Sequence, residues 1–262
     1  MLNIIDSHSH LDAPEFDPDR AAVIARARAA GVRAQILPAI DQRSWPRLKS
    51  LCATTPGLLP AYGLHPLLLA DHRDAHLVEL ADWLRDEAPV AVGECGLDFY
   101  VEDLDRARQQ AVFEAQLALA RQFDLPVIIH ARRAVEAVIL TLRRFAPLTG
   151  VVHSFPGSIE QARELEKLGF RLGIGGPLTY PRARKLREVV VTVPLEQLLV
   201  ETDAPDQPLC GHQGQRNEPA RCVEVVELIA RLRGLPVAQV AEQLVANALA
   251  LFGPRVVQAL SR

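Results

Sequence analysis

The sequence predicts a single α/β domain over residues 1–262, folded as a TIM (β/α)8 barrel. Short apolar runs recur eight times, and stretches rich in Ala, Leu, Arg and Glu, which are typical of helices, separate most of them. The ends of successive runs lie roughly 22 to 36 residues apart, the length of one βα unit. Eight such units match a closed barrel better than an open sheet.

The predicted elements alternate along the chain. Helices are predicted over residues 19–30, 77–86, 106–123 and 159–168. Each predicted strand is a short and nearly continuous apolar run, as expected of parallel strands covered on both faces. The strands are residues 4–8, 32–38, 59–63, 90–94, 127–130, 151–153, 171–175 and 198–201. After a loop over 204–218, helices over 221–233 and 237–251 complete the predicted outer ring.

Composition narrows the class of protein. Of the 262 residues, 49% are hydrophobic and 23% are charged, values usual for a globular protein. The net charge of −3 argues against wrapping long nucleic acids through bulk electrostatics, but it allows a local nucleic-acid site. The chain begins with no basic and apolar leader pattern, and no apolar run approaches the length of a membrane span, so we expect a cytoplasmic protein. Its four cysteines form no C-x-x-C pair and are expected to be reduced thiols.

Potential metal ligands stand at or just beyond the ends of six predicted strands. His8 and His10 are two residues apart, so on a strand they would project the same way. The carboxyl ends of barrel strands converge on one face, where the active sites of this fold lie. Any one of these residues could be an ordinary polar residue, exposed to solvent or hydrogen-bonded within the protein. That interpretation does not explain the whole set. The set is His8, His10, His65, Glu94, His130, His153 and Asp203.

Without His65, this set offers four histidines and two carboxylates, more donors than one four-coordinate ion needs. It therefore predicts a centre of two divalent ions. Glu94 would bridge the ions, and Asp203 would bind one of them and accept the proton of a trapped water, whose hydroxide would be the nucleophile. Mixed histidine and carboxylate ligands suit Zn, Mn, Fe and, less well, Mg, so the identity of the ions stays open.

Six segments together carry a resemblance to a known family. They are DSHSHLD (6–12), GLHP (63–66), GECGLDFY (93–100), VIIH (127–130), VVHSF (151–155) and ETDAP (201–205). In order and spacing they resemble the successive motifs of the TatD family, over residues 1 to about 252. Residues 206–215 resemble its YjjV-like branch more than the best-studied nucleases, which leaves the substrate open.

The resemblance implies an amidohydrolase-like barrel that performs divalent-metal hydrolysis, with deoxyribonuclease as the best-known activity. It implies ligand roles for the residues already selected at the strand ends: His8, His10, Glu94, His130, His153 and Asp203. It also implies that His65 contacts phosphate or acts in catalysis outside the metal ligands, and a histidine that only supports the ligands is the alternative.

Several arginines are candidates for binding substrate phosphate. Arg132 and Arg133 directly follow His130 and are well placed for bidentate hydrogen bonds to a phosphate. A further basic run follows the seventh strand, and it either contacts phosphates or forms a solvated helix face. That run is Arg182, Arg184, Lys185 and Arg187.

Other polar residues are left out of the predicted site. Cys95 follows Glu94 and should point the opposite way, as a small buried hydrophobe. His72 and His76 lack the glutamate of an H-E-x-x-H helix and have charged neighbours, which indicates an exposed surface. His212 has no assigned role.

The leading functional prediction is a deoxyribonuclease-type phosphodiesterase that binds DNA or another phosphodiester locally, without a membrane or an obligate protein partner. A recessed barrel mouth suits single strands or frayed ends, so exonuclease action is expected. The same centre acting on a carboxylic ester or amide, including an aminoacyl ester on transfer RNA, is the alternative. A non-catalytic metal or nucleic-acid binding module is a third possibility, but it would not need the proton acceptors Glu94 and Asp203.

Overall fold

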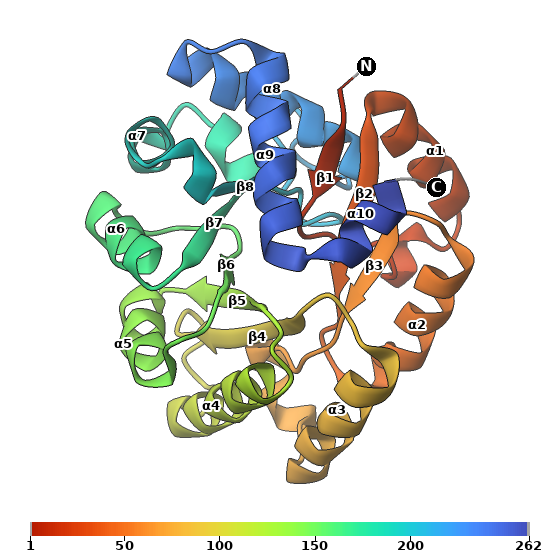
Figure 1. Cartoon of the computed structure of the whole chain (residues 1–262), viewed down its shortest axis with the longest axis vertical. Helices are drawn as coiled ribbons and strands as arrows, with labels where there is room; N and C mark the ends of the chain where they lie inside the picture. The colour runs from red at the N-terminus through yellow and green to blue at the C-terminus, as the bar shows by residue number, and fades with distance from the viewer. Residues whose placement is uncertain (1, 261–262) are drawn as a thin grey trace.

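The computed structural model describes residues 2–260 and arranges parallel strands in a ring that is surrounded by helices (Figure 1). All eight predicted strands are present among these residues, with shifted ends. They are β1 (Ile4–Asp6), β2 (Val32–Pro38), β3 (Leu58–Ala61), β4 (Val92–Asp98), β5 (Val127–Arg132), β6 (Gly150–Val152), β7 (Phe170–Ile174) and β8 (Leu198–Val200).

The ring consists of two hydrogen-bonded parallel sheets rather than one continuous ladder. One sheet has the order β1-β2-β3 and the other the order β4-β5-β6-β7-β8. The isolated bridge between Tyr62 and Val92 links β3 to β4. At the other junction, the Ser7 amide donates to the Val200 carbonyl over 3.0 Å. The barrel therefore has two seams where pairing is sparse.

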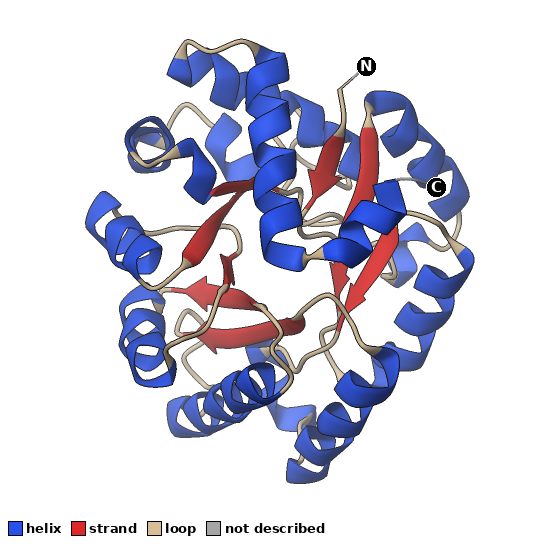
Figure 2. Ribbon diagram, viewed as in Figure 1, coloured by secondary structure: helices blue, strands red, loops and turns tan. Residues whose placement is uncertain are grey.

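Helices cover the outside of the ring, as Figure 2 shows. Six of them correspond to predicted ranges: α1 (Arg20–Ala30), α3 (Asp74–Glu87), α4 (Arg106–Gln122), α6 (Ile159–Lys167), α8 (Cys222–Arg233) and α9 (Val237–Phe252). The ranges predicted from the sequence did not include α2 (Trp45–Thr54), α5 (Val135–Phe145), α7 (Arg184–Thr192) and α10 (Pro254–Leu260). In α5 the buried residues Val135, Val138, Ile139 and Leu142 recur at helical spacing, so this helix was detectable.

The hydrophobic core has two parts. The larger lies between the strands and the surrounding helices, where strand residues such as Leu37 meet helix residues such as Val23. The smaller cluster brings inward-facing residues such as Ile36 and Ile128 together with Leu251 and Phe252 of α9. Figure 1 shows α9 and α10 lying across one end of the ring. Because apolar side chains fill that end, the polar side chains gather at the other.

Two of the shifted strand ends, those of β1 and β4, bear on the site. Strand β1 ends at Asp6, so His8 and His10 lie beyond the strand rather than within it. The Asp6 carboxylate accepts hydrogen bonds from the amides of His8 (3.2 Å) and Thr202 (3.1 Å), and the Ser9 amide still donates to the Ile36 carbonyl of β2 over 3.1 Å. Strand β4 continues to Asp98, because pairing with β5 persists past Glu94 as far as the Asp98–Arg132 pair.

Across residues 2–260, no single helix has both the length and the apolar composition that a membrane crossing requires. The pair Pro219–Arg233 and Val237–Phe252, which is bent by 113°, meets that test only when its two helices are taken together.

Candidate metal centre

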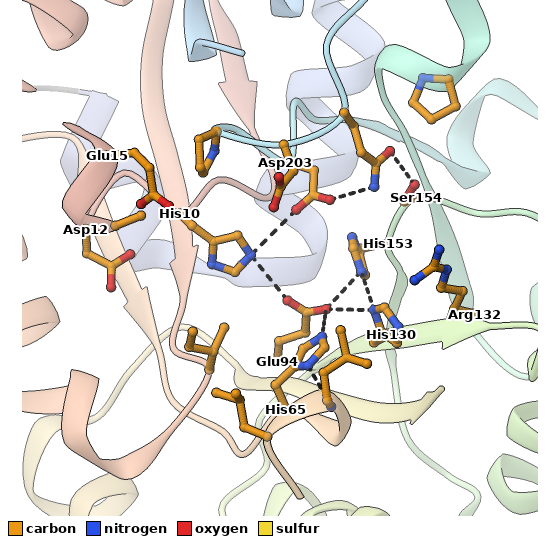
Figure 3. Close-up of a pocket in the computed structure, with 18 of the residues that line it drawn as sticks. His10, Asp12, Glu15, His65, Glu94, His130, Arg132, His153, Ser154 and Asp203 are labelled. Atoms are coloured by element: carbon orange, nitrogen blue, oxygen red, sulfur yellow. Dashed lines mark hydrogen bonds and ion pairs between the residues drawn. The ribbon is translucent and has the colours of Figure 1, made fainter. Parts of the chain in front are cut away.

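The predicted ligands meet in a cavity of about 1270 Å³ at the carboxyl ends of the strands (Figure 3). His10, Glu94 and Asp203 line this cavity, and so do His65, His130 and His153. His8 is fully buried beneath them. Residues almost two hundred positions apart in the sequence thus share one site, as the order of parallel strands requires.

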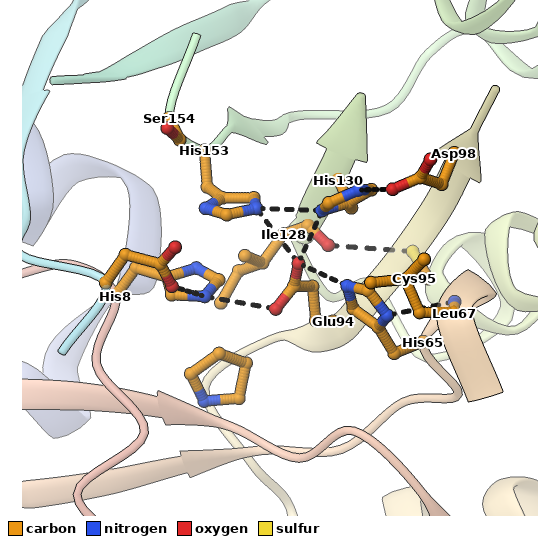
Figure 4. A network of polar contacts seen from close by, with 12 residues as sticks. His8, His65, Leu67, Glu94, Cys95, Asp98, Ile128, His130, His153 and Ser154 are labelled. Carbon is orange, nitrogen blue, oxygen red and sulfur yellow. Dashed lines mark hydrogen bonds and ion pairs between the residues drawn. The ribbon is translucent and has the colours of Figure 1, made fainter. Parts of the chain in front are cut away.

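Glu94 lies at the centre of the site, and its side chain is 2% exposed. Its two carboxylate oxygens face different histidines (Figure 4). Atom Oε2 lies 3.1 Å from Nε2 of His8 and 3.4 Å from Nε2 of His10. Atom Oε1 lies 2.9 Å from His153 Nε2, 3.0 Å from His65 Nε2 and 3.1 Å from His130 Nδ1. One carboxylate thus joins two separate groups of imidazoles.

Within each group, imidazole nitrogens face one another. Nε2 of His8 lies 3.1 Å from Nε2 of His10, and Nδ1 of His130 lies 3.2 Å from Nε2 of His153. Two imidazole lone pairs at such distances repel unless a proton or a cation lies between them. With a carboxylate oxygen beside each pair, the donor sets are those that divalent transition metals prefer. The residues present therefore fit a metal centre.

Asp203 adds a carboxylate to the His8 and His10 group. Its Oδ1 lies 3.4 Å from His8 Nε2 and 3.5 Å from His10 Nε2. The Gln207 side chain donates to Oδ2 over 2.6 Å, which fixes the carboxylate in place. The backbone of Asp203 has a φ of 57°, in the left-handed region that a non-glycine residue rarely adopts. Such strain is characteristic of functional sites.

The charges of the site favour bound positive charge. Burial would raise the pKa of Glu94, but the surrounding histidines, chiefly His153, hold it well below its usual range. Burial likewise opposes ionisation of Asp203, yet the hydrogen bond from His10 and nearby imidazoles lower its pKa to about 2. Burial and the neighbouring His153 lower the pKa of His8. Two ionised carboxylates thus lie within a shell of imidazoles, an arrangement in which cations can replace protons.

Two carboxylates that the sequence reasoning missed orient the histidines from behind. Asp98 Oδ2 lies 2.9 Å from His130 Nε2, on the ring edge opposite Glu94. Glu201 Oε1 lies 3.6 Å from His153 Nδ1 and accepts the Ser154 amide over 2.6 Å. Asp98 comes four residues after Glu94 on β4, so strand periodicity was the signal that could have placed it on the same face. For Glu201, the signal was its position as the last residue of the predicted eighth strand.

Three combinations of side chains could each hold an ion. They are His8, His10 and Glu94; His65, Glu94 and His130; and His8, His153 and Glu201. The third was not predicted. Its imidazoles stack with ring centroids 4.0 Å apart, and Nδ1 of both rings and Glu201 Oε2 are buried with no hydrogen-bond partner in the described chain. Buried polar atoms of this kind normally have a partner.

His65 touches Glu94 directly, although the sequence placed it outside the metal ligands. Its Nδ1 accepts the Leu67 amide over 3.1 Å, so in the neutral ring Nε2 carries the proton and donates it to Glu94. The expectation that His72 and His76 are exposed is wrong, since both are buried. His72 Nε2 lies 2.8 Å from the His65 carbonyl, so it supports the segment that carries His65.

The candidate substrate-binding arginines divide into two groups. Arg132 and Arg182 line the cavity, whereas Arg133, Arg184, Lys185 and Arg187 are not among its lining residues. Arg187 instead donates to the carbonyls of Leu178 and Thr179.

Cys95 and His212, which the sequence analysis left out of the site, do not line the cavity. Cys95 is fully buried with its Sγ 3.7 Å from the Ile128 carbonyl, in keeping with a small hydrophobe. His212 Nε2 lies 3.6 Å from a Glu224 carboxylate oxygen.

A parallel α/β barrel whose mouth holds five histidines around one carboxylate defines a class of protein: the metal-dependent hydrolases built on such a barrel. The particular family follows from comparison with known sequences. The chain belongs to the TatD-related DNase family, whose model matches residues 5–253. This confirms the resemblance carried by the six sequence motifs.

Individual relatives support this family assignment. The chain is 43% identical over 255 residues to YjjV of Escherichia coli strain K12, named an uncharacterized metal-dependent hydrolase, with 96% of this chain and 98% of that protein covered. It is 34% identical over 266 residues to the 3'-5' ssDNA/RNA exonuclease TatD of Erwinia amylovora, covering 95% of this chain and all of the relative. The crystal structure of Escherichia coli YjjV matches with a TM-score of 0.92 and 42% identity, over 95% of this chain and 97% of that one. The α/β barrel class is thereby confirmed.

Proposed function

We propose that this protein is a divalent-metal-dependent deoxyribonuclease that cleaves phosphodiester bonds from the end of a strand. The observation that carries the proposal is the position of Glu94 between two groups of facing imidazole nitrogens, with one carboxylate oxygen turned to each. This arrangement suits a pair of ions held by one shared carboxylate. The name of the Erwinia amylovora relative, an exonuclease of single-stranded DNA and RNA, supports a nucleic-acid substrate.

The two halves of the centre would have different ligands. One ion would be held by His8, His10, Glu94 Oε2 and Asp203, and the other by Glu94 Oε1, His130 and His153. Both sets combine imidazole nitrogen with carboxylate oxygen, which favours Zn, Mn or Fe over Mg. When bound, the ions supply Lewis acidity to a phosphate and make a coordinated water acidic near neutral pH.

The protein's own residues would then handle protons and charge. Asp203, held by Gln207, is the proposed proton acceptor for the attacking water, because its ionised carboxylate faces the His8 and His10 group. The Nε2–H of His65, which donates to Glu94 in this structure, is the proposed donor to a phosphoryl oxygen once Glu94 holds the ions, since Nδ1 is occupied by the Leu67 amide. Arg132 lines the cavity and is proposed to bind a phosphate, a role for which Arg133 is less well placed.

The test is digestion of end-labelled single-stranded and duplex DNA. Metal-stripped protein would be resupplied separately with Mg, Mn or Zn, beside a Glu94→Gln variant. We expect metal-dependent products from the wild type and a loss of activity of about 1000-fold or more in the variant, because the shared carboxylate and the transition-state stabilisation are both lost.

The outcome that would contradict the proposal is activity on carboxylic esters instead of DNA. If DNA stays intact with every metal while p-nitrophenyl esters or lactones are hydrolysed in a Glu94-dependent manner, the protein is an ester or amide hydrolase and the nuclease proposal is wrong. Hydrolysis of bis-p-nitrophenyl phosphate but not of the carboxylic esters would support phosphodiester chemistry.

A further inference from the structure

The two sides of the cavity rim differ in how their charged residues are paired. The loops that follow β1 and β2 contribute three carboxylates to the lining, Asp12, Glu15 and Asp41, together with Arg43 and Arg47. Both arginines are already paired with carboxylates: Arg43 Nη2 lies 2.9 Å from Asp71 Oδ2, and Arg47 contacts Asp17. Arg43 Nε also lies 3.7 Å from Asp41 Oδ2. This side of the rim therefore has no unpaired cation to attract a phosphate, and the two carboxylates without an ion pair among the described residues, Asp12 and Glu15, repel one.

The opposite side carries two arginines without such partners. Arg132 is the last residue of β5 and Arg182 follows β7, and both line the cavity with their side chains exposed. Within residues 2–260, no carboxylate lies at ion-pair distance from either guanidinium. Between them the wall is formed by Ser154, Pro156 and Pro177, which are uncharged. Apart from Glu94 and Asp203, the one carboxylate that the described residues place on this side of the lining is Asp206, in the loop after β8.

Each of the two arginines is held on a tyrosine ring. The guanidinium carbon of Arg132 lies 3.6 Å from the ring centroid of Tyr100, and that of Arg182 lies 5.2 Å from the ring centroid of Tyr180. The Tyr180 hydroxyl donates to the Pro208 carbonyl over 2.8 Å, which anchors this ring to the loop after β8. Stacking restrains a guanidinium but leaves its N–H edge free for bidentate binding of phosphate. The two groups are thus preorganised to bind anions.

From these contacts we infer that Arg132 and Arg182 bind two successive backbone phosphates of a single-stranded nucleic acid, which leaves the metal centre over the loops after β5 and β7. The inference rests on the proposed nuclease function and specifies its substrate: a strand with several phosphates, rather than a compact phosphodiester. The strand cannot continue over the β1 and β2 side, where carboxylates predominate. A strand end therefore lies at the metal centre, which accounts physically for cleavage from an end.

The experiment compares Arg182→Ala with a control from the same segment, Arg184→Ala. Arg184 is also exposed and begins α7, but it does not line the cavity, so its removal changes the net charge equally. Holoenzymes would be titrated with a fluorescein-labelled single-stranded hexanucleotide carrying phosphorothioate linkages, which slow turnover, and binding would be followed by fluorescence anisotropy across a range of salt concentrations.

We expect Arg182→Ala to raise the Kd by about 10-fold, the loss typical of one charge-assisted contact. The slope of log Kd against log salt should fall by about 0.7, as for one single-strand phosphate contact. Arg182→Lys should recover part of the affinity, because the charge returns without the planar fork. If Arg182→Ala and Arg184→Ala change the Kd and the salt slope equally, the inference is wrong.

The nuclease proposal is tested separately, by measuring DNA cleavage. If the holoenzyme cuts no DNA with any metal but binds the hexanucleotide with the expected dependence on Arg182, the nuclease proposal fails and the two-phosphate site stands. If cleavage depends on Glu94 while Arg182→Ala behaves like its control, the nuclease proposal stands and the two-phosphate site is rejected.

Discussion

The three-stranded sheet β1–β3 and the five-stranded sheet β4–β8 support their metal-site histidines in different ways. On the first side, His10 Nδ1 donates to the Pro38 carbonyl over 3.2 Å, and His8 Nδ1 has no partner among residues 2–260. On the second side, carboxylates lie behind both rings: Asp98 Oδ2 is 2.9 Å from His130 Nε2, and Glu201 Oε1 is 3.6 Å from His153 Nδ1, just beyond hydrogen-bond distance. A carboxylate behind a ligating imidazole raises its basicity and fixes its orientation more strongly than a carbonyl does.

The two sides also differ at the rim, where the first presents carboxylates and paired arginines and the second presents unpaired arginines. Together these differences indicate a division of labour. The five-stranded side would hold its ion more tightly and receive the phosphate backbone, while the three-stranded side would exclude the rest of the strand. Asp203, which follows β8, faces the His8 and His10 group and would accept the proton of the attacking water there. Glu94 lies on β4, next to the junction between the two sheets, and its carboxylate faces histidines of both sides.

The largest expected effect on this comparison between the two sides concerns whether the substrate strand is circular or linear. If carboxylates block the strand on the three-stranded side, a circular single strand cannot enter, because it must leave the centre in both directions. We expect cleavage of a circular single-stranded DNA to be slower than that of the same sequence in linear form by roughly 100-fold, as repulsion of several kcal/mol implies. Electrophoresis of both forms with the same metal measures the ratio of the two cleavage rates. Equal rates would show that the carboxylates on the three-stranded side do not block the strand.

An intermediate effect concerns the carboxylate behind His130. Asp98→Asn keeps the size of the side chain but removes its charge, so the ion on the five-stranded side should bind about 10- to 100-fold more weakly. Competition with a chelator, followed by metal analysis of the protein, measures this affinity. Asp86→Asn, on the exposed end of α3, is the matched control and should leave it unchanged. A loss confined to the ion on the His8 side would contradict the division of the site.

The positions of these candidate ligands were largely predictable from the sequence, because parallel strands bring their carboxyl ends together whatever the side-chain details. For Glu94, His130 and Asp203, strand order alone was sufficient. The supporting contacts were not predictable in this way. The carboxylate behind His130 depends on β4 extending to Asp98, and the segment that carries His8 and His10 is held by backbone hydrogen bonds beyond the end of β1, from Ser9 to Ile36 (3.1 Å) and from His10 to Ala204 (2.7 Å).

Charge pairing at the rim was equally hidden in the sequence. Arg43 and Arg182 are both arginines in loops after strands, yet Arg43 is paired with Asp71, 28 positions further along the chain, while Arg182 has no such partner among the described residues. Such pairing depends on how the loops pack, and neither periodicity nor motif spacing contains that information. The sequence could therefore name a group of basic candidates, but only the structure shows that Arg182 lines the cavity and that Arg184, Lys185 and Arg187 do not.

The smallest expected effect concerns the seam between β8 and β1, where ion pairs join α1 to the segment before α8. Arg216 contacts Asp19 through two bonds of 2.8 Å, and Arg26 contacts Glu218 at 2.7 and 2.8 Å. The hydrogen bond from Arg216 lowers the pKa of Asp19, and that from Arg26 lowers the pKa of Glu218. Because these folded-state pKa values lie below the unfolded ones, the stabilisation is complete above the unfolded pKa, about 4, and is lost as the pH falls through the folded values.

Replacing both arginines by glutamine should therefore lower the Tm at pH 7 by only about 1 to 3 °C, since exposed ion pairs contribute little and are screened by salt. Thermal unfolding at pH 7 and pH 3 measures the effect, and the difference between wild type and variant should shrink at the lower pH, as the carboxylates take up protons. A Tm difference that persists undiminished at pH 3 would show that packing of the arginine side chains, rather than their charge, joins the two sheets at this seam. In that case the sparse strand pairing at the seam is compensated by apolar contact, and its stability would not depend on ionic strength.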